Sequence, residues 1–448
     1  MVLTANMATK TIAAWALALQ FVHIPEPVLN ISVKSIYNWA GCAIGGYSQP
    51  AAGVAFEAVM PFMGNQGNST ILGTDTLVDA QTAALINGIA SHADDYDDTH
   101  RDNPIHPSGP VLSALLAVAE WKAPISGKDF VTAFVAGVET ECKLGVSVFP
   151  EHYNVGWRSV GAAVAVGKIL GLDLPKLQQA ISIASVQVTG MQESFGTDTK
   201  PFHVGRAAQN GLMAAILAEK GFSGSLKSLE APRGWSHVIS TRENLTAEAA
   251  TLGQRWEILL NTFKPFPCDR IIHPAIDGWI QVRKQALEQG LNINDITNVT
   301  ARTAPRVLFL TDNKTPKTGL EGKFSVYHAA AVALLSGEAT PTQFTDEMVR
   351  NTTVIALREK VAVTSDEAVE EHEAFVTVEF GSGKKIELHV EHAIGSYENP
   401  LSPAFLRTKF IEQVAKIIGD DRAEKAYAAF LGIANVTDVG MLARSYMA

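Results

Sequence analysis

The sequence is poor in cysteine. Of 448 residues only Cys42, Cys142 and Cys268 are cysteines, and no two of them form a C-x-x-C pair. This scarcity disfavours a disulfide-stabilised secreted domain and indicates a reducing compartment. It also disfavours an iron-sulfur cluster, whose ligands usually include a close pair on one loop. We therefore expect a cytoplasmic protein, and a mitochondrial location stays open.

Runs of basic residues are missing as well. Lys and Arg number 36 against 46 Asp and Glu, for a net charge of -10, which speaks against nucleic acid or an anionic membrane as a partner. The longest apolar runs, such as TIAAWALALQFV, are shorter than the ~20 residues that a spanning helix needs. The opening residues show no basic start followed by a cleavage site, so we expect neither a secretory signal nor a membrane anchor.

What the chain has in abundance is helical periodicity. With 47% hydrophobic and 18% charged residues, it can fill large cores. Up to about residue 255, Ala, Leu and Ile recur at helical spacing between capping residues, as in ISGKDFVTAFVAGVETECKLGV and DLPKLQQAISIASVQ. Ala and Gly on the buried sides favour close helix packing.

The pattern changes near residue 264. KPFPCDRIIHP contains three prolines, which interrupt a helix. ITNVTARTAPRVLFL is typical of a strand, and FVTVEFGSGKKIELHVEH alternates around a Gly-Ser-Gly turn and predicts a hairpin. After Pro400 the helical period returns. The sequence thus predicts a mainly α protein, with a helical domain at residues 1–262, a smaller α+β domain at 263–398 and a helical segment at 399–448 that can rejoin the first domain.

The segment HADDYDDTHRDNPIHPSG is the most unusual, with four aspartates between Asp94 and Asp98. The pattern D-D-x-x-D is also typical of a magnesium-diphosphate site of the isoprenoid-synthase kind. GDDRAE near residue 420 would be its second cluster. Alternatively, Asp94, Asp97 and Asp98 singly cap a helix end and are solvated. His106 precedes a helix start, where it can serve as an acid or base.

Three further segments gather cations and histidines. SFGTDTKPFHVGRAAQNG brings Lys200, His203 and Arg206 to a helix that we expect to begin near Val204, where an anion can bind. KPFPCDRIIHP sets Lys264 and His273 at the predicted domain junction, where ligands usually bind. KTGLEGKFSVYHAAAV adds another set before a helix: Lys317, Lys323, Tyr327 and His328. Each alone has an ordinary explanation as a surface or core residue.

Together these motifs, with LEAPRGW, resemble the successive motifs of the MmgE/PrpD family over nearly the whole chain. That family includes 2-methylcitrate dehydratase, cis-aconitate decarboxylase and iminodisuccinate epimerase, and the resemblance implies a helical domain with an α+β lid, usually as a homodimer. It implies that the active site is lined by Asp95, Thr99, His106, Lys200, Lys264 and either Tyr327 or His328. Where family members commonly carry a histidine, the shorter segment YNVGWRSVG has Arg158, and this puts a catalytic role at that position in doubt.

From these motifs we predict a cofactor-independent lyase that acts on a small di- or tricarboxylic acid without a metal ion. Its predicted catalytic residues are Asp95, His106, Lys200 and Lys264, with Asp95 orienting His106 and with Lys264 or Arg158 holding a distal carboxylate. Its predicted substrate-binding residues are Thr99, Arg158, His203, Arg206, His273, Tyr327 and His328. Two alternatives remain: an iminodisuccinate epimerase, to which HADDYDDT, TKPFH and LEAPRG are particularly similar, and a non-catalytic binding protein.

Overall fold

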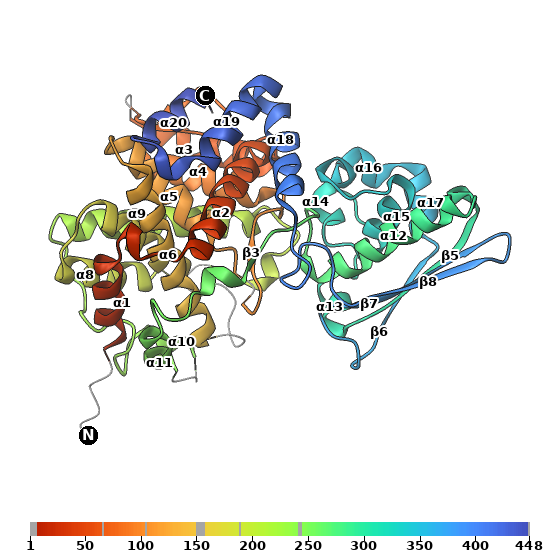
Figure 1. Cartoon of the computed structure of the whole chain (residues 1–448), viewed down its shortest axis with the longest axis horizontal. Helices are drawn as coiled ribbons and strands as arrows, with labels where there is room; N and C mark the ends of the chain where they lie inside the picture. The colour runs from red at the N-terminus through yellow and green to blue at the C-terminus, as the bar shows by residue number, and fades with distance from the viewer. Residues whose placement is uncertain are drawn as a thin grey trace.

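The structure of the chain is a computed structural model. It describes residues 7–64, 67–103, 105–148, 157–187, 190–240 and 244–446. Two bodies lie side by side along its longest axis (Figure 1), a larger helical one and a smaller one that carries the main sheet.

The larger body is built mostly from the N-terminal half of the chain. Its longer helices are α1 (Ala8–Ala18), α2 (Glu26–Gly46), α3 (Pro50–Val59), α4 (Ala80–Ala93), α5 (Ser108–Trp121), α6 (Gly127–Val148), α7 (Trp157–Ile169), α8 (Leu174–Ser185) and α9 (Thr199–Glu219). Two short helices, α10 (Trp235–Ile239) and α11 (Leu245–Ala250), and the two-residue strands β1 (Ser69–Thr70) and β2 (Leu77–Val78) complete this part.

The helix signals of the sequence act as expected. The Asp173 carboxylate accepts the N–H of Lys176 at the start of α8, and Ser126 Oγ accepts the N–H of Asp129 at the start of α6. Close packing of small residues is also confirmed, because a Cβ added to Gly88 on α4 would lie 2.5 Å from the Cα of Gly205 on α9. These two helices can approach so closely only because both positions are glycine.

The smaller body is the predicted α+β lid. Its sheet has the order β6-β5-β7-β8 and consists of β5 (Ile296–Thr303), β6 (Val361–Ser365), β7 (Ala374–Phe380) and β8 (Lys385–Val390). The predicted hairpin is confirmed, since β7 and β8 pair antiparallel with Phe375 opposite His389. Helices of this body are α12 (His273–Glu288), α13 (Pro305–Thr311), α14 (Gly319–Gly322), α15 (Val326–Ser336), α16 (Asp346–Arg350) and α17 (Thr352–Arg358).

The C-terminal helices lie beside the helices of the larger body (Figure 1). They are α18 (Pro403–Ile418), α19 (Asp420–Leu431) and α20 (Val439–Tyr446), and Figure 1 shows them beside the N-terminal helices. Phe410 on α18 packs edge-on against Tyr37 on α2, with ring centroids 6.5 Å apart. The boundaries 262/263 and 398/399 stay predictions at the level of single residues. Across the described part of the chain, no helix combines the length and apolar character that crossing a membrane requires.

Candidate active site

The acidic segment is held between the two bodies by a small ladder. After α4 ends at Ala93, the chain turns through residues 94–98 into β3 (Thr99–His100), which pairs antiparallel with β4 (Asn261–Thr262). Thr262 Oγ1 donates to the carbonyl of Thr99 over 2.7 Å. This ladder brings the acidic segment next to the proline-rich segment that starts the lid, so that Lys264 reaches Asp95.

Asp95 is the centre of a buried charge cluster. Its Oδ2 accepts a hydrogen bond from Lys200 Nζ at 2.6 Å and its Oδ1 one from Lys264 Nζ at 2.5 Å. Burial opposes the charged form, but the two ammonium groups hold the pKa of this carboxyl well below its usual range. Among the described residues, Asp95 is the only non-glycine with a positive φ, 50°. Such backbone strain persists where surrounding contacts fix the conformation.

Two more buried lysines fix the same loop. Lys323, which follows α14 in the lid, donates to Asp94 Oδ1 at 2.7 Å. Lys409 on α18 donates to the carbonyl oxygens of Tyr96 and Lys264 at 2.7 and 2.9 Å. Burial lowers the pKa of Lys409 to about 8. Together with Lys200 and Lys264, four chain segments far apart in sequence therefore each supply a lysine to this loop.

The expectation that Asp94, Asp97 and Asp98 are solvated is wrong. All three are at most 4% exposed, because partners from distant segments compensate for the loss of water. The Asp98 carboxylate accepts hydrogen bonds from Ser108 Oγ and Asn261 Nδ2, and burial raises its pKa to about 6. Asp94, Asp95 and Asp98 thus have separate partners. Asp420 is exposed, unlike these buried carboxylates, so the structure does not support the second cluster of the magnesium-diphosphate hypothesis.

Asp97 is the carboxylate that contacts His106. Its Oδ1 lies 2.8 Å from His92 Nδ1 and 3.4 Å from His106 Nδ1. Burial opposes ionisation, but the two histidines hold the pKa of Asp97 well below its usual range. The prediction that Asp95 orients His106 therefore needs correction, since the side-chain oxygens of Asp95 accept from the two lysines and the orienting carboxylate is Asp97.

His106 is arranged as a neutral base. Its Nδ1 lies 3.0 Å from the carbonyl oxygen of Asp98, and because a carbonyl can only accept, Nδ1 carries the proton. The lone pair is then on Nε2. Burial lowers the pKa of His106 to about 3, so the ring is neutral at ordinary pH. Thr99 Oγ1 lies 3.4 Å from His106 Nδ1, so Thr99 also contacts this histidine.

A metal ion can be considered at this cluster. One ligand atom from each of His92, Asp95, Asp97 and His106 lies within 4.8 Å of the others. However, an ion bound there would stand beside the ammonium groups of Lys200 and Lys264, which already neutralise Asp95. The charge balance favours acid-base chemistry, and the absence of a metal requirement stays a prediction.

The helix that carries Lys200 starts earlier than expected. It is α9, which begins at Thr199 and not near Val204, because Pro201 is tolerated within a first helical turn. Lys200 and His203 are buried on its inner side, and burial lowers the pKa of His203 to about 4. Arg206 is exposed and donates to Gln209 Oε1 on the same helix at 2.6 Å. Its predicted substrate contact is not supported by this position.

The remaining predicted residues belong to α7 and to the lid. Arg158 is buried on α7, and its charge opposes the rise in the pKa of Glu141 that burial causes. The first residues of the shortened segment, 153–156, lie outside the described residues, and most of the rest forms α7. In the lid, Tyr327 Oη donates to Asp312 at 2.5 Å and His328 Nε2 lies 2.8 Å from the carbonyl of Gln343. The described contacts of both side chains stay within the lid.

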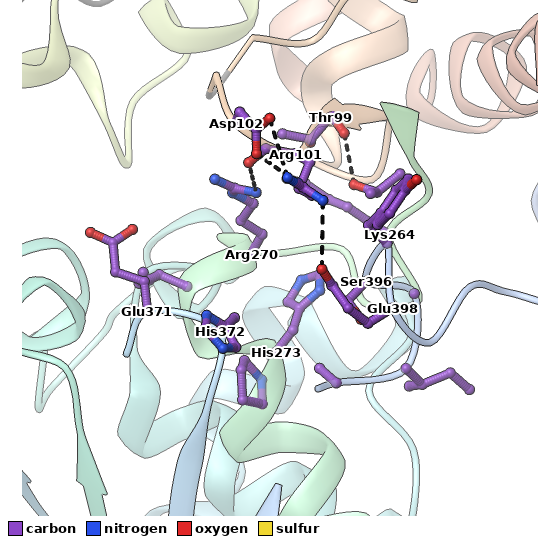
Figure 2. A pocket seen from close by; sticks show the side chains of 17 residues that line it. Thr99, Arg101, Asp102, Lys264, Arg270, His273, Glu371, His372, Ser396 and Glu398 are labelled. Atoms are coloured by element: carbon purple, nitrogen blue, oxygen red, sulfur yellow. Dashed lines mark hydrogen bonds and ion pairs between the residues drawn. The ribbon is translucent and has the colours of Figure 1, made fainter. Parts of the chain in front are cut away.

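A pocket opens between the two bodies beside the cluster, with a volume of about 410 Å³. Figure 2 shows its polar side chains pointing toward one another from the ladder and from the lid. Thr99, Lys264 and His273, all predicted site residues, line it together with Arg101 and Arg270. Lys264 donates to Asp95 Oδ1, to the Asp95 carbonyl and to the Cys268 carbonyl, so all three of its N–H groups are used and a grip on a distal carboxylate is not supported.

Several residues of the site were missed by sequence reasoning. Asp97 and His92 lie in the quoted acidic segment, and their helix-end spacing could have suggested a pair. Lys409 and Asn261 sit in segments without any motif, and Arg270 is one residue among the prolines of KPFPCDRIIHP. Only the fold brings these residues to the site.

Comparison with known proteins agrees with this architecture. The family model for the MmgE/PrpD N-terminal domain matches residues 10–248, and that for the MmgE/PrpD C-terminal domain matches residues 266–432. The chain belongs to the MmgE/PrpD family. The resemblance noted in the motifs and the predicted mainly α fold are confirmed.

Named relatives within the family are lyases. The chain is 26% identical to a cis-aconitate decarboxylase of Aspergillus terreus, over 97% of this chain and 94% of the relative, and 26% identical to the human cis-aconitate decarboxylase, over 97% and 93%. It is also 26% identical to the 2-methylcitrate dehydratase of Escherichia coli K12, over 84% and 86%. These relatives support a lyase of the MmgE/PrpD family and favour neither the epimerase nor the non-catalytic alternative.

Proposed function

We propose that the protein is a cofactor-independent lyase that acts on a small carboxylic acid, either dehydrating a 2-methylcitrate-like acid or decarboxylating a cis-aconitate-like acid. The observation that carries the proposal is the neutral His106, with its proton fixed on Nδ1, beside the two lysines that share Asp95. A base and a fixed pair of cations are what both reactions need.

Lys200 and Lys264 stabilise the negative charge that builds up in both reactions. Breaking a bond next to a carboxylate places an electron pair on a group that is already negative, and prearranged cations lower the energy of that state. Lys200 and Lys264 are 6% and 4% exposed, so their charges act where water screens little. Asp95 keeps the two ammonium groups side by side, although their like charges repel.

His106 moves the proton. In a dehydration, Nε2 removes a proton from the carbon next to a carboxylate, and the electron pair moves onto that carboxylate. The pair then returns to form the carbon-carbon double bond, as the hydroxyl on the neighbouring carbon takes up the proton from Nε2 and leaves as water. In a decarboxylation, carbon dioxide leaves first and the electron pair delocalises onto a remaining carboxylate. A protonated His106 then delivers a proton to carbon. The neutral resting state starts the first reaction directly, whereas the second requires prior protonation.

Proton NMR in heavy water tests the proposal. The purified protein is incubated separately with 2-methylcitrate and cis-aconitate in the presence of EDTA, and a new olefinic or decarboxylated product is expected. His106→Asn should lower the rate by about 10²-fold to 10⁴-fold, while His389→Asn, which changes an exposed histidine of the lid sheet, should leave it unchanged. Unaltered rates in His106→Asn, or complete loss with EDTA, would contradict the proposal.

The same incubation, repeated with iminodisuccinate, tests the two alternative functions. Deuterium that enters otherwise unchanged iminodisuccinate would establish an epimerase, and unchanged spectra with every acid would favour a binding protein. The homodimer that the family resemblance implies stays a prediction, and light scattering coupled to gel filtration measures it directly.

A further inference from the structure

The pocket beside the catalytic cluster has its own chemistry. We call it the distal pocket and define it by Arg101, Arg270, His273, Glu371 and Glu398, which line it together with Thr99 and Lys264. Because Thr99 contacts His106 and Lys264 contacts Asp95, one end of the pocket lies at the reacting groups. The other end extends toward the lid (Figure 2).

Nearly all charges in the distal pocket are balanced inside the protein. Arg101 pairs with Asp102 at 2.6 Å and lies 3.8 Å from Glu398. Glu371 lies 3.6 Å from Arg306, and Lys264 pairs with Asp95. These pairs leave one pocket cation to account for.

Arg270 is that cation. No carboxylate of the described residues lies within 4.0 Å of its guanidinium. Its Nη1 donates to the carbonyl oxygen of Arg101 at 3.0 Å, which fixes the position of the side chain and uses one of five N–H donors. Burial lowers the pKa of Arg270, although the carboxylates of Asp269, Glu371 and Asp102 oppose this change without forming an ion pair with it, so its charge is held in the pocket at a cost in free energy.

Building on the proposed function, we infer that Arg270 binds a substrate carboxylate remote from the bond that breaks, so that the distal pocket selects tricarboxylates over acids that lack this group. A guanidinium with free donors binds a carboxylate through two parallel hydrogen bonds. The part-buried position makes such a contact stronger than at the surface. Lys264 cannot take this role without giving up the contacts that hold Asp95.

The test uses binding of an acid that the reaction cannot consume. Tricarballylate has the tricarboxylate skeleton without a hydroxyl or a double bond, and methylsuccinate is the same skeleton with one carboxymethyl group replaced by methyl. Calorimetry measures both acids on the full chain and on Arg270→Gln, Arg270→Lys and the control Arg302→Gln, which removes an exposed arginine of β5 that pairs with Asp366 outside the pocket.

We expect Arg270→Gln to weaken tricarballylate binding by about tenfold or more, as loss of a charged hydrogen bond does. Methylsuccinate binding should change by less than about twofold, and Arg302→Gln should affect either acid by less than about twofold, as for exposed charges. Arg270→Lys should be intermediate, because it keeps the charge but loses the paired hydrogen bonds. It also decides the outcome if Arg270→Gln does not fold.

Three results would overturn the inference: equal binding of the two acids by the unaltered protein, an equal loss of both acids in Arg270→Gln, or no binding of tricarballylate at all. Its failure is distinct from failure of the proposed function. Arg270-dependent binding without turnover of any acid would remove the lyase, whereas turnover with an unchanged KM in Arg270→Gln would remove only the role of Arg270.

Discussion

The catalytic cluster and the distal pocket lie side by side but differ in how their charged side chains are paired. In the cluster, Asp95 has two lysine partners and Asp97 has two histidine neighbours, all of them buried. In the distal pocket, Arg270 has no carboxylate partner among the described residues. The charged side chains of the cluster are therefore paired within the protein, whereas the role proposed for Arg270 makes a substrate carboxylate its ion-pair partner.

This difference separates two tasks. Groups that act on the transition state work best when they are fixed in advance, because they need no rearrangement during the reaction. A group that recognises the substrate gains most when its partner is the substrate, because binding then supplies the missing interaction. We therefore expect substitutions in the cluster to lower kcat and substitutions in the pocket to raise KM.

Lys264→Met should produce the largest effect. It leaves Asp95 with one ammonium partner and frees the Asp95 and Cys268 carbonyls in a buried setting. We expect kcat to fall by at least about 10²-fold to 10³-fold, as on loss of a fixed charge that stabilises the transition state, and the free energy of unfolding to fall by about 3 kcal/mol or more. Turnover assays and urea unfolding measure the two changes.

The control for this substitution is Lys385→Met, which removes an exposed lysine paired with Glu387 on β8. It should change neither quantity appreciably. If Lys264→Met altered KM alone, Lys264 would belong to substrate recognition and the separation of cluster from pocket would break down.

Asp97→Asn should have the next largest effect. The amide can no longer accept from the two imidazole N–H groups as an anion, so His106 loses a partner that fixes its orientation. We expect kcat to fall by about 10²-fold with little change in KM. Asp98→Asn is the matched control, since the Asp98 side chain bonds Ser108 and Asn261 and its backbone carbonyl, which the substitution retains, is what contacts His106.

The pH profile sharpens the role of His106. Burial lowers its pKa to about 3, and the neutral form is the base, so the fraction of active base stays high as pH falls through the ordinary histidine range near ~6.5. For dehydration we expect the acid limb of kcat well below that range. Asp98 is a neighbouring group that titrates near this range, because burial raises its pKa to about 6. The pH profile of Asp98→Asn shows whether an acid limb near that pH comes from Asp98. A limb near ~6.5 that persists in Asp98→Asn would contradict the assigned base.

The sequence predicted which residues form this site better than it predicted which of them contact one another. Periodicity and prolines sufficed for the two bodies and the hairpin, because local patterns determine such features. Asp95, His106, Lys200 and Lys264 were found because they stand in recognisable motifs, which here share one cluster. The partner of His106 was misassigned, because neighbouring aspartates at 95 and 97 differ only in the direction that the strained loop gives them.

Lys323→Met should have the smallest effect on activity, and it probes how the lid is joined to the helical body. Lys323 reaches from the lid to Asp94 over 2.7 Å, and both side chains are buried. Its removal leaves the Asp94 carboxylate with the hydrogen bond from Gln49 at 2.9 Å, so we expect a loss of about 3 kcal/mol in unfolding free energy with only a few-fold change in kcat.

The double variant Lys323→Met with Asp94→Leu identifies the source of that loss. If the cost comes from leaving Asp94 buried without its cation, replacing both partners by apolar residues should recover most of the stability, as for other buried pairs. If the double variant stays as unstable as the single one, the contact between the two bodies depends on the ion pair itself. In that case a drop in kcat larger than that of Asp97→Asn would show that the lid, and not only the cluster, positions the catalytic groups.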